Sequence, residues 1–135
     1  MPTFNDTTGE TWVVSVTLGT LEDIRERFSV NILDNPGEMP SGIRDMVNLV
    51  WVCCEDQANR LGVTPRDFGR RLDGDAIEKA IESFMESYTD FFCRLQPARG
   101  EAIREIWKQG KALEERTLQD VKKAFLKSTI ASPAL

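Results

Sequence analysis

The sequence predicts a mainly α fold, with four to five helices and an N-terminal β-hairpin. Three observations support this prediction. Apolar residues recur at helical spacing along most of the chain. Glycine and proline separate these stretches at clear boundaries. Strand-like alternation of apolar and polar residues occurs near the N-terminus. The length of 135 residues suits one domain, which we place at 1–128, with a frayed tail at 129–135.

The hairpin is expected within residues 3–17. The residue pattern predicts two short strands, at 4–7 and 10–17, and the second is rich in β-branched and aromatic residues. Gly9 lies between them, where it can supply the positive φ of a tight turn. Two strands alone are marginally stable in water. The apolar face of the second strand must therefore pack on helices or on another subunit, and it carries Trp12, Val14 and Val16.

The helical body is predicted over residues 20–96. Thr20 and Asp23 approximate a capping pair at the start of its first helix. The apolar residues of this helix are spaced to lie on one buried face, and they are Leu21, Ile24 and Phe28. Two prolines and two glycines in eight residues make 35–42 a loop.

A long helix should follow this loop, with Ser41 as its N-cap and Gly62 as its stop. Its middle, residues 46–54, is apolar nearly all round, which predicts burial in the core or in an interface. Thr64 and Pro65 then begin a short helix, because proline fits the first helical position.

Two further helices complete the prediction. Asp73 caps a helix that runs to about Leu95, and Pro97 separates it from a last helix over 98–127. The first of these two helices carries an aromatic-rich stripe of Ile77, Ala80, Ile81, Phe84, Tyr88, Phe91, Phe92 and Leu95.

The charge distribution and the absence of histidine limit the possible functions. Residues 1–97 hold 9 basic and 17 acidic side chains, whereas residues 98–135 hold 8 and 5. The net charge of −5 disfavours nucleic-acid binding. The chain has no apolar run long enough to span a membrane, and no secretory signal, so we expect a cytoplasmic protein. Without histidine, the usual general base and zinc ligand are missing, so we expect no enzyme and no cofactor.

Three groups of residues that could carry chemistry have simpler structural explanations. Asp73 and Asp75 could hold a cation, but two acids at a helix start already oppose the helix dipole. Cys53 and Cys54 are adjacent and so cannot easily form a disulfide on a helix, which favours buried thiols. The acids at 78, 82 and 86 share one helix face, which favours a solvated surface, with an acidic patch for a basic partner as the alternative.

Aromatic and aliphatic residues are the best candidates for a partner-binding surface. The tryptophans favour core positions, but Trp107 lies between Arg104 and Lys108 in the mildly basic last segment, and Trp and Arg often dominate interfaces. The candidate partner-binding residues are Trp107, Ile103, Leu113, Phe91, Phe92 and Trp51.

The order of these pieces resembles small tail assembly chaperone-like proteins of tailed phages and prophages. The resemblance covers roughly residues 4–96 and rests on the hairpin ending in VSVTLGTLEDIRERFSVNIL and on IRDMVNLVWVCC. Its most distinctive stretch is LGVTPRDFGRRLDGDAIEKA, and it includes no catalytic motif.

The resemblance implies a chaperone that binds and solubilises the tape measure protein, or other tail components, in the bacterial cytoplasm. Such a chaperone is not expected in the mature virion. Coating a long partner favours many weakly bound copies, so we expect a homo-oligomer or polyvalent binding. Two alternatives remain: a structural neck or tail protein of the virion, and a small metal-dependent carboxylate enzyme.

Overall fold

The computed structural model describes residues 2–110, 120 and 123. About 69% of these residues are helical and an antiparallel hairpin lies at the N-terminus, so the predicted fold class is confirmed. The chain divides into two compact units, residues 1–100 and 101–135. Most of the predicted last helix beyond Gly110, and the tail at 129–135, lie outside the described residues.

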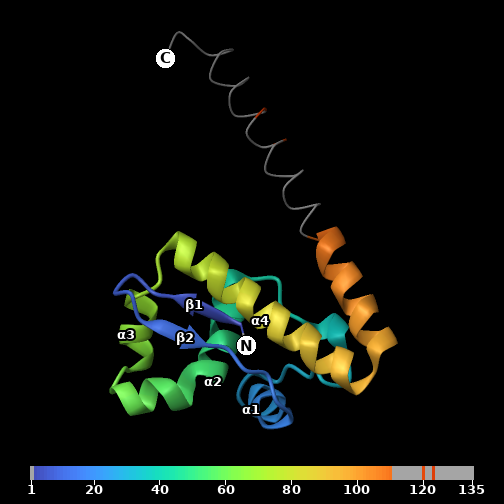
Figure 1. Cartoon of the computed structure of the whole chain (residues 1–135), viewed down its shortest axis with the longest axis horizontal. Coiled ribbons are helices and arrows are strands. Elements are labelled where there is room, and N and C mark those ends of the chain that lie inside the picture. The colour runs from blue at the N-terminus through green and yellow to red at the C-terminus, as the bar shows by residue number, and fades with distance from the viewer. Residues whose placement is uncertain (1, 111–119, 121–122, 124–135) are drawn as a thin grey trace. The chain divides into compact units, whose positions relative to one another are not determined.

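The elements follow one another with short connections (Figure 1). In chain order they are β1 (Thr3–Asn5), β2 (Thr11–Val13), α1 (Leu18–Phe28), the 3₁₀ turn η1 (Pro36–Glu38), α2 (Ile43–Leu61), α3 (Pro65–Arg70) and α4 (Gly74–Leu95). Residues 97–110 are also helical. In the first unit, β1 packs on α4, and α2 contacts β2, α4 and α1.

The hairpin forms, but both strands are shorter than predicted: β1 spans Thr3–Asn5 instead of 4–7, and β2 spans Thr11–Val13 instead of 10–17. Phe4 pairs with Trp12 in the antiparallel register, and Gly9 in the turn has a φ of +87°. The regular strand ends at Val13, although the Val14 N–H still donates a bond of 3.0 Å to the Pro2 carbonyl. The alternation still holds beyond this point, and the side chains of Trp12, Val14 and Val16 are buried.

Side chains from the helices complete the hydrogen bonding of this small sheet. The Gln57 amide on α2 accepts a bond of 3.1 Å from the Val13 N–H and donates one of 2.8 Å to the Thr11 carbonyl. On α4, the Ser83 hydroxyl donates to the Thr3 carbonyl at 3.0 Å. The Ser87 hydroxyl accepts from the Val16 N–H at 2.9 Å. The helices therefore take the place of neighbouring strands.

Gln57→Leu should lower the free energy of unfolding by about 1–2 kcal/mol, because it leaves the Val13 N–H and the Thr11 carbonyl without their partner. Urea denaturation measures this change. The matched control is Asn59→Leu, which replaces an exposed amide on the same helix and should cost less than about 0.5 kcal/mol. Equal losses in the two variants would contradict this role of Gln57.

The starts of α1 and α2 differ from the prediction. The first helix begins at Leu18 rather than Thr20, and the Thr17 hydroxyl caps it by accepting from the Thr20 N–H at 3.2 Å. Gly42 rather than Ser41 occupies the N-cap of α2 and makes no side-chain bond there. In each case, the N-cap is the last residue with an extended backbone before the helix begins.

The end of α2 and the starts of α3 and α4 agree with the prediction, whereas the last helix begins at Pro97 rather than at residue 98. Gly62 ends α2 with a φ of +70°, and Thr64 and Asp73 accept bonds from the backbone N–H three residues on. Phe28 was predicted to be buried with Leu21 and Ile24. Its side chain is instead 37% exposed, because it lies in the last turn of α1.

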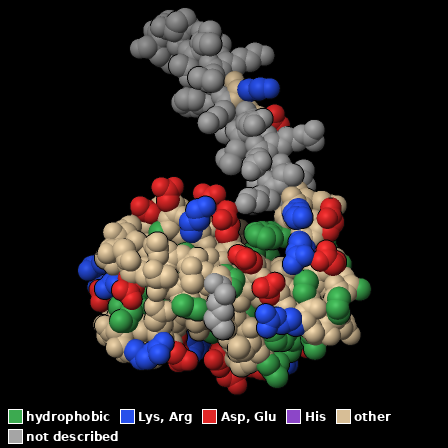
Figure 2. Space-filling view, viewed as in Figure 1, with side chains coloured by type: hydrophobic (Ala, Val, Ile, Leu, Met, Phe, Trp, Pro, Cys, Tyr) green, Lys and Arg blue, Asp and Glu red, His purple; other side chains and the backbone are tan. Residues whose placement is uncertain are grey.

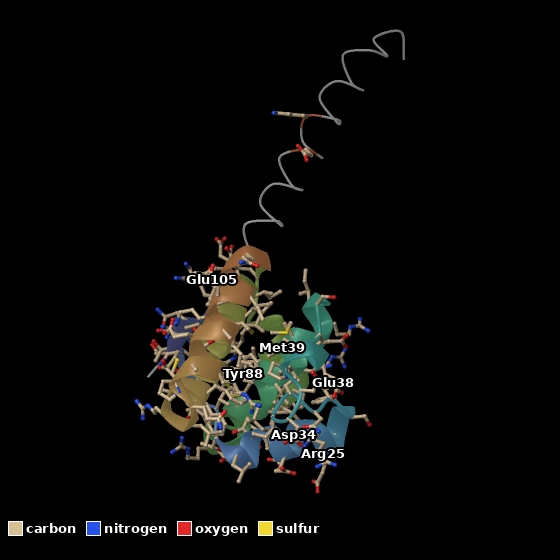
Figure 3. All side chains as sticks on the ribbon, turned by 90° about the vertical axis from the view of Figure 1, so that its right-hand side faces the viewer. Arg25, Asp34, Glu38, Met39, Tyr88 and Glu105 are labelled. Atoms are coloured by element: carbon tan, nitrogen blue, oxygen red, sulfur yellow. The ribbon has the colours of Figure 1, made fainter. Side chains whose placement is uncertain are left out.

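Aromatic rings form the core of the first unit. Phe68 on α3 lies 5.0 Å from Trp12 and 5.2 Å from Trp51 between ring centroids. Tyr88, which is labelled in Figure 3, lies in the second half of α4. Its hydroxyl donates a hydrogen bond of 2.7 Å to the Ile32 carbonyl. Burial raises the pKa of the Tyr88 phenol well above its usual value, so it stays protonated and holds the loop before α2 against α4.

Candidate functional site: exposed apolar surfaces

Several large hydrophobic side chains of the described residues remain exposed. On the face seen in Figure 2, such side chains appear as separate patches among acidic and basic ones. The exposed set consists of Val13, Leu18, Phe28, Ile43, Leu61, Leu95 and Ile106. Two places combine this exposure with residues that the sequence singled out: the helical segment 101–110, and a groove beside the end of α4.

The segment 101–110 is helical and carries apolar residues at helical spacing. Ile106 is 68% exposed, the largest exposed fraction among the large hydrophobic side chains described. Trp107 is half-buried and Ile103 is buried. Residues 106 and 107 lie about one turn from residue 103, three and four positions along the helix, but Ile103 itself is covered. Leu113 lies outside the described residues.

A second surface is a groove of about 560 Å³ in the first unit, which we call the α1–α4 groove. Leu18 at the start of α1 is 55% exposed, and Leu95 at the end of α4 is 57% exposed. Phe91, one turn before Leu95, is half-buried and also lines the groove. Of the predicted partner-binding residues that the structure describes, Phe91 alone lines this groove.

Two charged residues on α4 border the apolar part of the α1–α4 groove. Asp90 and Arg94 are exposed and lie one helical turn apart, beside Phe91 and Leu95. Within the described part of the chain, neither Asp90 nor Arg94 forms a salt bridge. The groove therefore presents an apolar strip flanked by one carboxylate and one guanidinium.

Phe92 and Trp51 pack in the core and belong neither to the segment 101–110 nor to the α1–α4 groove. Phe92 is fully buried, with its ring centroid 5.0 Å from that of Tyr88. The Arg99 guanidinium lies 6.0 Å from the Phe92 centroid, within cation–π range. Trp51 is half-buried and packs on Phe68. A partner could reach Phe92 only if the core opened.

The residues that could have carried redox or metal chemistry have structural roles. Burial raises the pKa of the Cys54 thiol to about 12, and it raises that of Cys53 further, so neither is a reactive thiolate. Asp73 caps α4 through a bond of 2.9 Å from the Ala76 N–H. In residues 2–110, 120 and 123, no three potential ligands cluster in a way that could hold a metal ion.

Glu55 is held in an ion pair between two helices. Its carboxylate oxygens accept bonds of 2.6 and 2.8 Å from the Arg27 guanidinium of α1. These bonds lower the pKa of Glu55 and raise that of Arg27. On α4, Glu78 and Glu86 are exposed, whereas Glu82 is half-buried and its carboxylate lies 3.7 Å from the Lys79 ammonium.

One buried charged residue, Asp6, was not predicted from the sequence. Its side chain is fully buried in the hairpin turn, and its carboxylate accepts a bond of 2.9 Å from the Trp12 indole N–H. The Thr8 N–H and hydroxyl donate at 2.8 and 2.6 Å, and the Glu10 N–H donates at 3.1 Å. Arg71 approaches to 3.4 Å. The signal was local: Asp two residues before Thr and three before Gly is typical of an Asx turn.

Comparisons with known protein families, with curated proteins and with solved structures found no significant match. The described helices include none that is both long and apolar enough to cross a bilayer.

Proposed function

We propose that this chain is a non-enzymatic phage tail assembly chaperone that binds and solubilises the tape measure protein during tail morphogenesis. The observation that carries the proposal is the 68% exposure of Ile106 on the helical segment 101–110. The resemblance of residues 4–96 to tail chaperone-like proteins gives the partner its identity. The proposed site of action is the bacterial cytoplasm, and the finished virion should lack the chain.

The proposed binding mode is the packing of an apolar partner helix on the face that carries Ile106 and Trp107. Burial of one isoleucine side chain contributes about 1.5–3 kcal/mol. A few such contacts give weak binding per copy, so a long partner is held by many copies, whose linked contacts provide avidity. The acidic excess over residues 1–97 would keep the coated partner soluble, because the copies repel one another.

The test is co-expression with the proposed partner, a tape measure protein. With the wild-type chain, that protein should stay soluble and co-purify. Ile106→Asp should weaken this association by about 30-fold or more, because it places a carboxylate in an apolar contact. The soluble fraction and the co-purified amount are measured.

Ile43→Asp is the matched control, because Ile43 is 64% exposed but lies at the start of α2. This control should solubilise the partner as the wild type does. An unchanged result with Ile106→Asp, or equal losses in both variants, would contradict the proposed site.

The alternative is a structural protein of the phage neck or tail. Mass spectrometry of purified particles distinguishes the two functions. A chaperone should be missing from the particles, whereas a structural subunit would be present in a fixed copy number.

A further inference from the structure

We propose that the α1–α4 groove is the interface of an antiparallel homodimer, in which the end of α4 packs on the same part of α4 in a second copy. The apolar part of the groove supplies the contact. Leu18 and Leu95 are more than half exposed, and Phe91 is half-buried. Because all three belong to the first unit, the inference does not depend on the segment 101–110 or on the proposed chaperone function.

Charge complementarity identifies the second copy as the occupant. Asp90 and Arg94 lie along one strip of α4, one turn apart, next to the strip that carries Phe91 and Leu95. In an antiparallel pair of identical helices, the row of residues on one side of the contact faces the same row of the partner helix. The two rows run in opposite directions. A two-fold axis near residue 92 then places Asp90 of each copy opposite Arg94 of the other.

The opposite orientation is disfavoured by the same two charges. In a parallel pair, the two-fold axis runs along the helices, so the Asp90–Arg94 strips of the two copies lie on opposite sides of the contact and cannot pair. The position of the two charges on one side of the apolar strip therefore selects the antiparallel arrangement, in which both pairs are attractive.

The floor of the groove is already fixed in the single chain. The Ser87 hydroxyl accepts from the Val16 N–H and so holds the extended segment before α1 against α4. Val16 is 8% exposed beneath the groove. A second copy can therefore dock without rearranging the backbone. The apolar area is small for a stable interface, so the dissociation constant should be of the order of 100 µM.

The experiment is sedimentation equilibrium of the full chain from about 10 µM to about 1 mM, a range that brackets the expected constant. The wild type should pass from monomer to dimer. Asp90→Arg and Arg94→Asp should each weaken dimerisation at least about 10-fold, because each reversal appears twice across a two-fold interface and turns both attractions into repulsions.

Heterodimer formation in a mixture of the two variants is the most discriminating measurement. A heterodimer of the Asp90→Arg and Arg94→Asp chains has two attractive pairs again, so it should form within about 3-fold of the wild-type constant. The chain with both substitutions should also dimerise with itself, but not with the wild type. Glu78→Arg, the same charge change on an exposed part of α4, is the control and should dimerise normally.

A wild-type chain that stays monomeric throughout this range would overturn the inference. Dimerisation that both single variants retain would overturn it as well, since the interface would lie elsewhere. So would single variants that fail to restore a dimer when mixed. The thermal unfolding of the variants should match the wild type, because the exposed Asp90 and Arg94 side chains form no ion pair within the described part of the chain.

Discussion

Phe68→Ala is expected to lower the free energy of unfolding by about 4 kcal/mol, the largest effect of any single truncation proposed for this chain. Phe68 is 2% exposed and holds together three segments of the core. Its ring meets Trp12 and Phe4 of the hairpin edge to face, and it lies 5.2 Å from Trp51 of α2. Removing the ring leaves a cavity that rigid neighbours cannot fill.

Chemical denaturation, followed by tryptophan fluorescence, measures this loss. Phe28→Ala provides the control, because the same side chain is removed from a position that is 37% exposed. It should cost about 1 kcal/mol or less. A cost for Phe68→Ala no larger than for Phe28→Ala would mean that α3 does not anchor the hairpin as described.

Asp6 is expected to make the fold sensitive to acid. Burial alone raises the pKa of this carboxyl group, but hydrogen bonds from Thr8, Trp12 and Glu10 outweigh it and lower the pKa from 3.8 to about 2. Because the pKa of Asp6 is lower in the folded state than in the unfolded chain, the ionised carboxylate stabilises the fold at pH values above the pKa of the unfolded chain. That stabilisation is lost as the pH falls from about 4 to 2. A shift of this size corresponds to about 2 kcal/mol.

Asp6→Asn removes this titration. At pH 7 the variant should be less stable than the wild type by about 2 kcal/mol, because the amide accepts fewer and weaker bonds than the carboxylate. As the pH falls below about 4, the two stability curves should converge. Urea denaturation at several pH values measures both curves. If the free energies of unfolding of the two proteins differed by the same amount at every pH in this range, the pKa of Asp6 would not be lowered in the folded state.

Local signals in the sequence were sufficient for most helix boundaries and for the hairpin turn. Gly9 and Gly62 occupy left-handed backbone conformations that other residues rarely adopt. Thr64 and Asp73 cap helices through bonds that reach only three residues along the chain. Each of these features depends on neighbouring residues, so the sequence around it was enough to predict it.

Features that depend on distant residues were not predicted. Gln57 bonds to a strand more than 40 positions away, and Ser83 and Ser87 bond to segments more than 70 positions away. Small polar residues on a helix give no sequence signal for such pairing. The placement of Phe92 in the core and of Phe91 in the groove likewise follows from tertiary packing, since both belong to the same aromatic-rich stripe.

The dimer and the chaperone proposal would support each other if both hold. A dimer carries two copies of the segment 101–110, so one partner helix could be held at two points. Two linked contacts bind more tightly than either alone without any new contact surface. The charge reversals at Asp90 and Arg94 should then weaken the association with the partner by less than the loss of about 30-fold or more that is expected of Ile106→Asp.

The most direct test of the central claim is hydrogen exchange of this chain, alone and in complex with the co-expressed tape measure protein. Backbone amides of residues 101–110 are expected to exchange more slowly in the complex, while those of α2 are unchanged. Slower exchange confined to α2 or to the hairpin, with no change over 101–110, would contradict the claim that the exposed face around Ile106 binds the partner.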